Sequence, residues 1–219
     1  MRGKFITIEG PDGAGKTTQV QKIADYFKQK GKKTVITREP GGTALGEKLR
    51  EVLLSTGGES PVPEAEALIY AASRAQLVKR VIAPALSEGN IVICDRFLDS
   101  SLAYQGWARG LGIRRVLEIN RWFMEDFFPD LTVILDIDPE VSLTRLKGRR
   151  DRLEMESMSF HKKVREGFLN VHRMFPERTK LVDASKSREL VFSDILREIE
   201  RIYLERGDGH ETGSGGGSG

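Results

Sequence analysis

The sequence predicts an α/β protein in which a five-stranded parallel sheet is flanked by helices on both faces. Five short, largely β-branched apolar runs alternate with helical patterns along the chain, as they do where crossover helices join parallel strands. Most of these runs are apolar at consecutive positions, which indicates strands that are buried on both faces. With 219 residues, of which 39% are hydrophobic and 31% charged, the chain suits one substantial domain with its own core.

The predicted strands are residues 5–8, 34–37, 91–94, 131–135 and 180–182.
Helical periodicity fills the segments between them. Val20, Ile23, Ala24 and Phe27 recur at the i, i+3, i+4, i+7 spacing of one helix face, and this helix ends near Gly31. The other predicted helices occupy about residues 45–53, 65–86, 116–127, 164–175 and 190–202, and one more begins at Pro139 with Asp138 as its cap.

Residues 10–17, GPDGAGKT, match the phosphate-binding loop pattern G-x-x-x-x-G-K-[ST]. A predicted strand precedes the loop and a predicted helix follows it, which is the context that the pattern requires. The three glycines let the backbone turn tightly and point its N–H groups inward, where the helix N-terminus adds positive charge. We expect Lys16 to reach the β- and γ-phosphates of ATP and the Thr17 hydroxyl to ligate Mg²⁺. The fold class is therefore the three-layer fold of the P-loop nucleoside triphosphatases.

Charged residues directly follow the second and third predicted strands, as residues 38–39 and as Asp95-Arg96. Ligands of parallel sheets bind beyond the carboxyl ends of the strands, so these groups should meet the phosphate loop at one rim. Asp95 is expected to hold Mg²⁺ directly or through water, and Arg96 to bind a phosphate. A surface ion pair at the strand end is the alternative interpretation.

A basic segment follows the helix that begins at Pro139. It contains Arg145, Lys147, Arg149, Arg150 and Arg152. Positive charge over a phosphate site stabilises the group that is being transferred. We expect only one or two of these side chains to contact phosphate and the others to form a solvated charged surface.

Composition narrows the function classes. The formal net charge is only +3, with basic and acidic residues interspersed, so nucleic-acid binding is not indicated. Cys94 is the only cysteine; we expect it to be buried, and an intramolecular disulfide is excluded. No apolar run approaches the roughly 20 residues that span a bilayer, and no signal peptide is visible, so we expect a cytoplasmic protein without a membrane partner. One domain is expected over residues 1–207, followed by a disordered tail of linker composition at 208–219.

Several conspicuous residues receive structural interpretations. Trp107 and Trp122 are expected in the core or in a subunit interface rather than in a substrate site. His161, His172 and His210 lack the spacing of metal ligands, so we interpret them as structural or exposed. The chain contains no N-K-x-D pattern, which disfavours a guanine-specific GTPase.

Five motifs in order make the chain resemble the bacterial-type thymidylate kinase (dTMP kinase) family over about residues 4–205. They are residues 9–18, 37–43, 72–76, 95–106 and 129–132. The resemblance implies transfer of a phosphoryl group from Mg-ATP to dTMP, in the synthesis of dTTP for DNA replication. It also implies a homodimer with ATP and dTMP as its ligands.

The resemblance carries over to individual residues of the acceptor site. Tyr70 would stack on thymine, at a position where the family usually has Phe, and Arg74 would donate to the thymine O4. Ser101 and Gln105 would lie at the base edge around N3, with Tyr104 under the sugar. The residues implied for dTMP are Asp12, Glu39, Pro40, Arg50, Tyr70, Arg74, Arg96, Ser100, Ser101, Tyr104 and Gln105.

The phosphates and the donor nucleotide are assigned in the same way. Glu39, Arg50 and Arg96 would surround the acceptor phosphate, and Asp12 would reach the sugar 3′-OH. The residues implied for ATP are Gly10, Pro11, Asp12, Gly13, Ala14, Gly15, Lys16, Thr17, Thr18 and Arg145, with Thr17 and Asp95 toward Mg²⁺. The catalytic set is Asp12, Lys16, Arg96, Arg149 and Arg150.

The lid of the family corresponds to about residues 145–156. Some members carry the catalytic arginine in the phosphate loop, directly after the aspartate, and others carry it in the lid. Here Gly13 follows Asp12, so the arginine must come from the lid, and Arg149 and Arg150 are the candidates. A cis peptide bond is expected at Glu39-Pro40, where the loop turns sharply.

Two other functions stay open on the sequence alone. One is a kinase of the same fold that acts on another monophosphate, such as a UMP/CMP or guanylate kinase, against which the Tyr70/Arg74 spacing argues. The other is an ATPase switch or motor, against which Asp95-Arg96 and the lid argue, because a switch needs no acceptor site.

Overall fold

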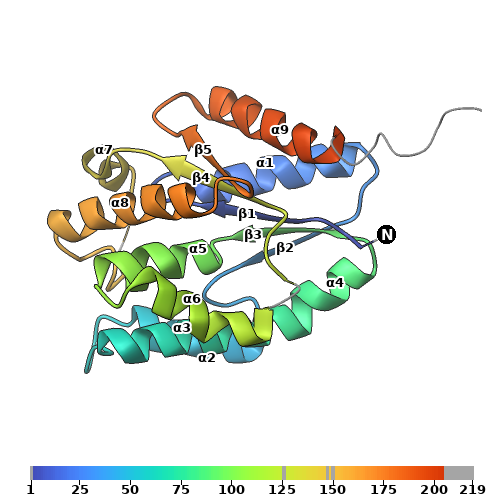
Figure 1. Ribbon diagram of the computed structural model, residues 1–219. Coiled ribbons are helices and arrows are strands. Elements are labelled where there is room, and N and C mark those ends of the chain that lie inside the picture. Colours follow the sequence, from blue (N-terminus) through green and yellow to red (C-terminus); the bar gives the residue numbers. More distant parts are fainter. Residues whose placement is uncertain (1, 125–126, 147, 149–150, 205–219) are drawn as a thin grey trace, which may run out of the picture.

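The structure is a computed structural model that describes residues 2–124, 127–146, 148 and 151–204. Its five strands are β1 (Phe5–Glu9), β2 (Thr34–Arg38), β3 (Ile91–Asp95), β4 (Leu131–Asp136) and β5 (Thr179–Asp183). They form one sheet in the order β2-β3-β1-β4-β5, and every neighbouring pair is parallel (Figure 1). The predicted five-stranded parallel sheet is therefore confirmed.

Helices occupy the connections between the strands. They are α1 (Lys16–Gln29), α2 (Ala44–Leu54), α3 (Pro63–Leu77), α4 (Ala83–Ser87), α5 (Leu98–Ser101), α6 (Ile113–Met124), α7 (Pro139–Thr144), α8 (Met158–Met174) and α9 (Arg188–Leu204). Two π-helical segments are inserted among them, η1 (Val78–Ile82) and η2 (Leu102–Ala108). No helix within the described ranges is long and apolar enough to cross a membrane.

The sheet is the middle of three layers. Figure 1 shows α1 and α9 together on one side of it, with α3, α4 and α6 on the other. Ile6 and Ile8 of β1 belong to the core on the α1/α9 side, whereas Phe5 belongs to the core on the opposite side. A third apolar cluster joins Tyr70 and Tyr104 to residues of α8. Burial on both faces is what the continuous apolar strands predicted.

The helix predicted over 65–86 is interrupted by η1. Pro84 has no N–H to donate to the carbonyl four residues earlier, so an uninterrupted α-helix would leave that carbonyl unpaired. The chain widens instead, and the N–H of Ala83 reaches back five residues to the carbonyl of Val78. A second difference is the helical stretch of α5 and η2, which the sequence did not predict.

Individual expectations outside the site had mixed outcomes. Cys94 is buried, as expected. Trp122 is 78% exposed and Trp107 is 42% exposed, so the core is excluded for both, and the other expected place, a subunit interface, stays a prediction. His161 is buried, and His172 Nδ1 lies 2.9 Å from the Thr179 hydroxyl, in agreement with structural roles, whereas position 210 and the tail at 208–219 lie outside the described residues.

Candidate active site

The phosphate loop connects β1 to α1 and turns where only glycine fits. Gly10 and Gly13 have φ angles of 133° and 77°, in the region that favours glycine. A Cβ at Gly13 would collide with the carbonyl oxygen of Ser142. Ser142 belongs to α7, the helix that directly precedes the lid segment. The backbone therefore approaches α7 more closely than any other residue type would allow.

Lys16, the first residue of α1, folds back over this loop. Its Nζ donates to the carbonyl oxygens of Gly10 at 3.2 Å and Pro11 at 2.8 Å. The side chain is buried, and burial together with the positive charge of Arg96 lowers the pKa of Lys16 to about 8. A negatively charged phosphate in the loop would favour the protonated amine.

Thr17 and Asp95 meet although they are far apart in the sequence. The Thr17 hydroxyl donates to Asp95 Oδ2 at 2.6 Å, which joins the start of α1 to the end of β3. A hydroxyl and a carboxylate are oxygen ligands of the kind that Mg²⁺ prefers, so the residues present fit the ion. Within the described residues no group of three or more His, Cys, Asp or Glu side chains could hold a metal, so phosphate oxygens would have to supply further ligands.

Arg96 adopts an unusual backbone conformation, with a φ of 67°. Such a conformation costs a non-glycine residue on the order of 1 kcal/mol or more, and here Glu9 holds it. Glu9 is fully buried at the end of β1 and accepts from the N–H of Phe97 at 2.8 Å and from the Ser100 hydroxyl at 2.6 Å. Burial and the nearby Asp99 raise the pKa of Glu9 to about 8.

The result is that the Arg96 guanidinium points back toward the phosphate loop. It donates to the Gly10 carbonyl at 2.9 Å and to the Ser100 hydroxyl at 3.1 Å, and it pairs closely with Asp12. Asp12 also accepts from the Tyr104 hydroxyl at 2.9 Å. Burial alone would raise the pKa of Asp12, but the charges of Arg96 and Lys16 outweigh it and lower that pKa to about 2.

Two cavities adjoin this group of charges. The loop cavity is lined by residues 12–18, by Asp95 and by Arg145, together with Ala184 and residues 186–188. The inner cavity lies beyond it and is lined by all eleven residues that the sequence associated with the acceptor, which are Asp12, Glu39, Pro40, Arg50, Tyr70, Arg74, Arg96, Ser100, Ser101, Tyr104 and Gln105. Of the residues implied for ATP, only Gly10 and Pro11 do not line the loop cavity.

The two cavities share one boundary. Five residues line both of them, which are Asp12, Glu39, Arg50, Arg96 and Glu154. Arg50 is held there by a hydrogen bond from its Nη1 to the Pro40 carbonyl at 2.9 Å, and the Glu39-Pro40 peptide bond is cis, as expected. A group in the inner cavity therefore faces a group in the loop cavity across this boundary.

The inner cavity has aromatic and polar walls. Tyr70 comes from α3 and Tyr104 from η2, and both rings are almost fully buried. Burial raises the pKa of each phenol, so both hydroxyls stay protonated near neutral pH. Gln105 is 1% exposed and donates its amide Nε2 to Glu66 Oε1 at 2.8 Å.

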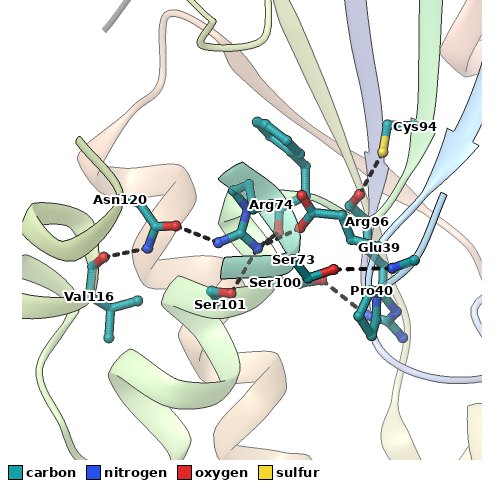
Figure 2. A network of polar contacts seen from close by, with 12 residues as sticks. Glu39, Pro40, Ser73, Arg74, Cys94, Arg96, Ser100, Ser101, Val116 and Asn120 are labelled. Carbon is teal, nitrogen blue, oxygen red and sulfur yellow. Dashed lines mark hydrogen bonds and ion pairs between the residues drawn. The ribbon is translucent and has the colours of Figure 1, made fainter. Parts of the chain in front are cut away.

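Arg74 is the centre of a buried network (Figure 2). Its Nη1 donates to Asn120 Oδ1 at 2.7 Å, and its Nη2 donates to Glu39 Oε2 at 2.5 Å and to the Ser101 hydroxyl at 2.9 Å. Arg74 is 1% exposed and Glu39 4%. Burial raises the pKa of Glu39 to about 7 against the opposing attraction of Arg74. The partner of Glu39 is thus Arg74, and the contacts to thymine O4 and to the acceptor phosphate stay predictions.

The basic lid residues divide into different roles. Arg145 donates to the Ala184 carbonyl at 3.0 Å and lines the loop cavity. The Arg152 side chain instead contacts α2 and α3. It donates to the Leu53 carbonyl at 2.9 Å and pairs with Glu66 at 2.5 Å. Positions 147, 149 and 150 lie outside the described residues, so the two candidates for the catalytic arginine, Arg149 and Arg150, are not placed.

Comparison with known proteins identifies the family. A family model described as thymidylate kinase matches residues 8–195 of this chain. The chain belongs to the thymidylate kinase family. It is 50% identical over 208 residues to a thymidylate kinase of Bacillus anthracis (strain A0248), in an alignment that covers 93% of this chain and 100% of the relative. Relatives from Bacillus cereus (strain AH187) and Bacillus thuringiensis (strain Al Hakam), both named thymidylate kinase, are 50% and 49% identical with the same coverage.

Sequence reasoning missed three polar residues that shape this thymidylate kinase site. Glu9 supports the backbone of Arg96, Asn120 supports Arg74, and Glu66 holds Gln105. An acid at the end of an apolar strand and an asparagine on an apolar helix face were the available signals for the first two, because buried polar groups need partners. No local pattern distinguished Glu66 from an ordinary surface acid of a helix.

Proposed function

We propose that this chain transfers the γ-phosphoryl group of Mg-ATP to the 5′-phosphate of dTMP, giving ADP and dTDP. The observation that carries the proposal is the shared boundary of the two cavities, where Asp12, Arg50 and Arg96 lie between the phosphate loop and the acceptor residues. A donor in the loop cavity and an acceptor in the inner cavity bring the reacting atoms together there. Such positioning, with electrostatic stabilisation, accounts for most of the catalysis of phosphoryl transfer.

The donor phosphates are held by the loop amides and by Lys16. Thr17 and Asp95 are the residues that would hold Mg²⁺, which neutralises charge on the phosphates when it is bound. Lys16 exchanges its hydrogen bonds to the Gly10 and Pro11 carbonyls for phosphate oxygens. Since the amine must be protonated for this, its lowered pKa makes donor binding sensitive to pH.

The acceptor phosphate is held by Arg96 and Arg50. Arg96 is already oriented by Asp12 and the Gly10 carbonyl, so little side-chain freedom is lost when the phosphate binds. Asp12 has a second task in the proposal, which is to accept from the 3′-OH of the sugar, and its lowered pKa keeps it an acceptor. Glu39 contributes indirectly, by holding Arg74.

A lid arginine completes the charge stabilisation. Because Gly13 occupies the position after Asp12, we assign this role to Arg149 or Arg150. An arginine that stabilises the transferring group is worth about 10³–10⁵ in rate, or roughly 4–7 kcal/mol. Arg145 lies on the loop-cavity side and is assigned to the bound donor nucleotide.

The base is selected by the inner cavity. Thymine stacks on Tyr70, and Arg74 donates to its O4. Uracil lacks only a methyl group, which is worth about 1–3 kcal/mol in an apolar pocket, so dUMP should be a poor but real substrate. Cytosine sets an amino group against the Arg74 donor, and unpaired buried polar groups can cost about 10⁴-fold, so dCMP should be nearly inert.

The test is ADP formation with Mg-ATP and a panel of dTMP, dUMP, dCMP, UMP, GMP and AMP. Fast turnover with dTMP, slow turnover with dUMP and almost none with dCMP is the expected result. Preference for another monophosphate would retain the reaction class but refute the roles of Tyr70 and Arg74. ATP consumption that does not depend on any acceptor would favour the ATPase switch instead.

We also propose that the chain acts as a homodimer. Exposed apolar side chains on three adjacent helices support this, namely Val52 of α2, Leu68 of α3 and Trp122 of α6, which are 54%, 56% and 78% exposed. Burying such side chains between two copies removes apolar surface from water. Sedimentation equilibrium of the whole chain tests the proposal, and a monomer at micromolar concentration would refute it. The cytoplasmic location expected from the sequence stays a prediction.

A further inference from the structure

Glu66 is a fully buried acid in α3 that contacts both Gln105, which lines the inner cavity, and Arg152 of the lid segment. Its Oε1 accepts from Gln105 Nε2 at 2.8 Å, and its Oε2 pairs with Arg152 Nη2 at 2.5 Å. Arg109 lies 3.4 Å from each of the two oxygens. Guanidinium donors of Arg109 and Arg152 thus face the oxygens of this one carboxylate, which leaves it the role of an acceptor.

A charged carboxylate only accepts hydrogen bonds, and this determines the orientation of Gln105. The amide of a glutamine has a donating and an accepting end that differ little in shape. With Glu66 on one side, only the NH₂ end of Gln105 fits there, so the carbonyl oxygen is left for the other side. Gln105 lines the inner cavity, and no described residue donates a hydrogen bond to its Oε1.

We propose that Glu66 is a positioning residue that fixes the Gln105 amide with its oxygen toward the inner cavity, and so selects a base that carries an N–H at that edge. The proposal rests on dTMP being the acceptor. Thymine and uracil carry a hydrogen on N3 and donate, whereas the N3 of neutral cytosine only accepts. A Gln105 oxygen held in this orientation therefore accepts a hydrogen bond from N3 of thymine or uracil and repels N3 of cytosine. This discrimination is separate from any contact of Arg74 with O4.

The same carboxylate fastens the lid segment beside the cavity. Arg152 precedes Leu153, whose side chain lines the inner cavity, and Arg109 also pairs with Glu156 at 2.6 Å. Loss of Glu66 would therefore disturb the lid as well as Gln105. An experiment on Glu66 needs a control that disturbs the lid contact alone.

The test compares kcat/KM for dTMP and for dCMP in the whole enzyme. In Glu66→Gln the neutral amide both donates and accepts, so Gln105 is free to turn over, and the dTMP/dCMP ratio should narrow by about tenfold or more. Arg152→Met is the control, because it removes the lid ion pair and leaves the Glu66–Gln105 hydrogen bond. That variant should lower activity toward both substrates together and keep the ratio within about twofold of wild type.

A double mutant completes the experiment. In a Gln105→Leu background the ratio should already be narrowed, and adding Glu66→Gln should change it no further, because the two residues act through one amide. If Glu66→Gln does not fold, as judged by circular dichroism, Gln105→Leu alone decides, and a wild-type ratio in it overturns the proposal. A wild-type ratio in folded Glu66→Gln, or equal narrowing in Arg152→Met, also overturns it. A wild-type enzyme that does not phosphorylate dTMP would refute the proposed function instead.

Discussion

Replacing Arg74 should show how much the free energy of unfolding depends on one buried ion pair beside the inner cavity. Arg74 and Glu39 are 1% and 4% exposed, and their charged groups lie 2.5 Å apart. In Arg74→Met the side-chain volume is partly kept, but the Glu39 carboxylate, which is 4% exposed, loses its counter-charge. Removing one partner of a buried pair costs about 3–5 kcal/mol. We expect a loss of that size in the free energy of unfolding at pH 8.

The second variant in this series separates the ion pair from packing. Adding Glu39→Gln to Arg74→Met removes the unpaired charge, and replacing both members of a buried pair is often close to neutral. The double variant should therefore recover most of the loss. Urea unfolding followed by circular dichroism measures both values. A loss below about 1 kcal/mol in the single variant, or a double variant as unstable as the single one, would refute this reasoning.

The pH dependence of the same variant provides an independent check. The pKa of Glu39 is raised in the folded protein to about 7, so the folded state binds more protons than the unfolded state, and stability falls as pH rises toward that value. Without Arg74 the folded-state pKa must rise further, which extends the fall to higher pH. The deficit of Arg74→Met should consequently be larger near about pH 8.5 than near about pH 5.5. An equal deficit at both values would mean that the Glu39 charge is not its cause.

Three further predictions concern the phosphate site. Donor binding, measured by calorimetry with ADP, should weaken above pH about 8, where Lys16 loses its charge, and Lys16→Arg should show no such weakening up to about pH 9.5 because arginine stays protonated. Alanine in place of the true lid arginine, Arg149 or Arg150, should lower kcat at least about a hundredfold with nearly unchanged dTMP affinity; a few-fold loss at both positions would contradict the assignment. Asp95→Asn should raise the Mg²⁺ concentration for half-maximal activity by about 10–100-fold, whereas Thr17→Ser, which keeps the hydroxyl, should change it little.

The fold class could be predicted from the sequence, and so could most of the residues that line the two cavities, whereas their roles toward ATP and dTMP stay predictions. Apolar runs at consecutive positions can be stable only in a sheet covered on both faces, so strand number and direction followed from local composition. The phosphate loop was recognisable because tight turning requires glycines at fixed spacing, and Gly13 indeed lies where a Cβ would collide with the Ser142 carbonyl. The residues that directly follow the strands could be predicted to lie close together, because the carboxyl ends of parallel strands meet at one edge of the sheet.

The pairing of the buried polar groups could not be predicted from the sequence and is visible in the folded chain alone. Asn120 and Arg74 are separated by 46 residues, and Glu66 and Arg152 by 86, so no local spacing relates them. A hydrogen bond is specified by the position of two atoms within a few tenths of an ångström, and that position depends on how whole helices pack. For the same reason the sequence could not decide between the core and an exposed face for Trp122, which is 78% exposed, since a large apolar residue on a helix face has the same local pattern in both cases.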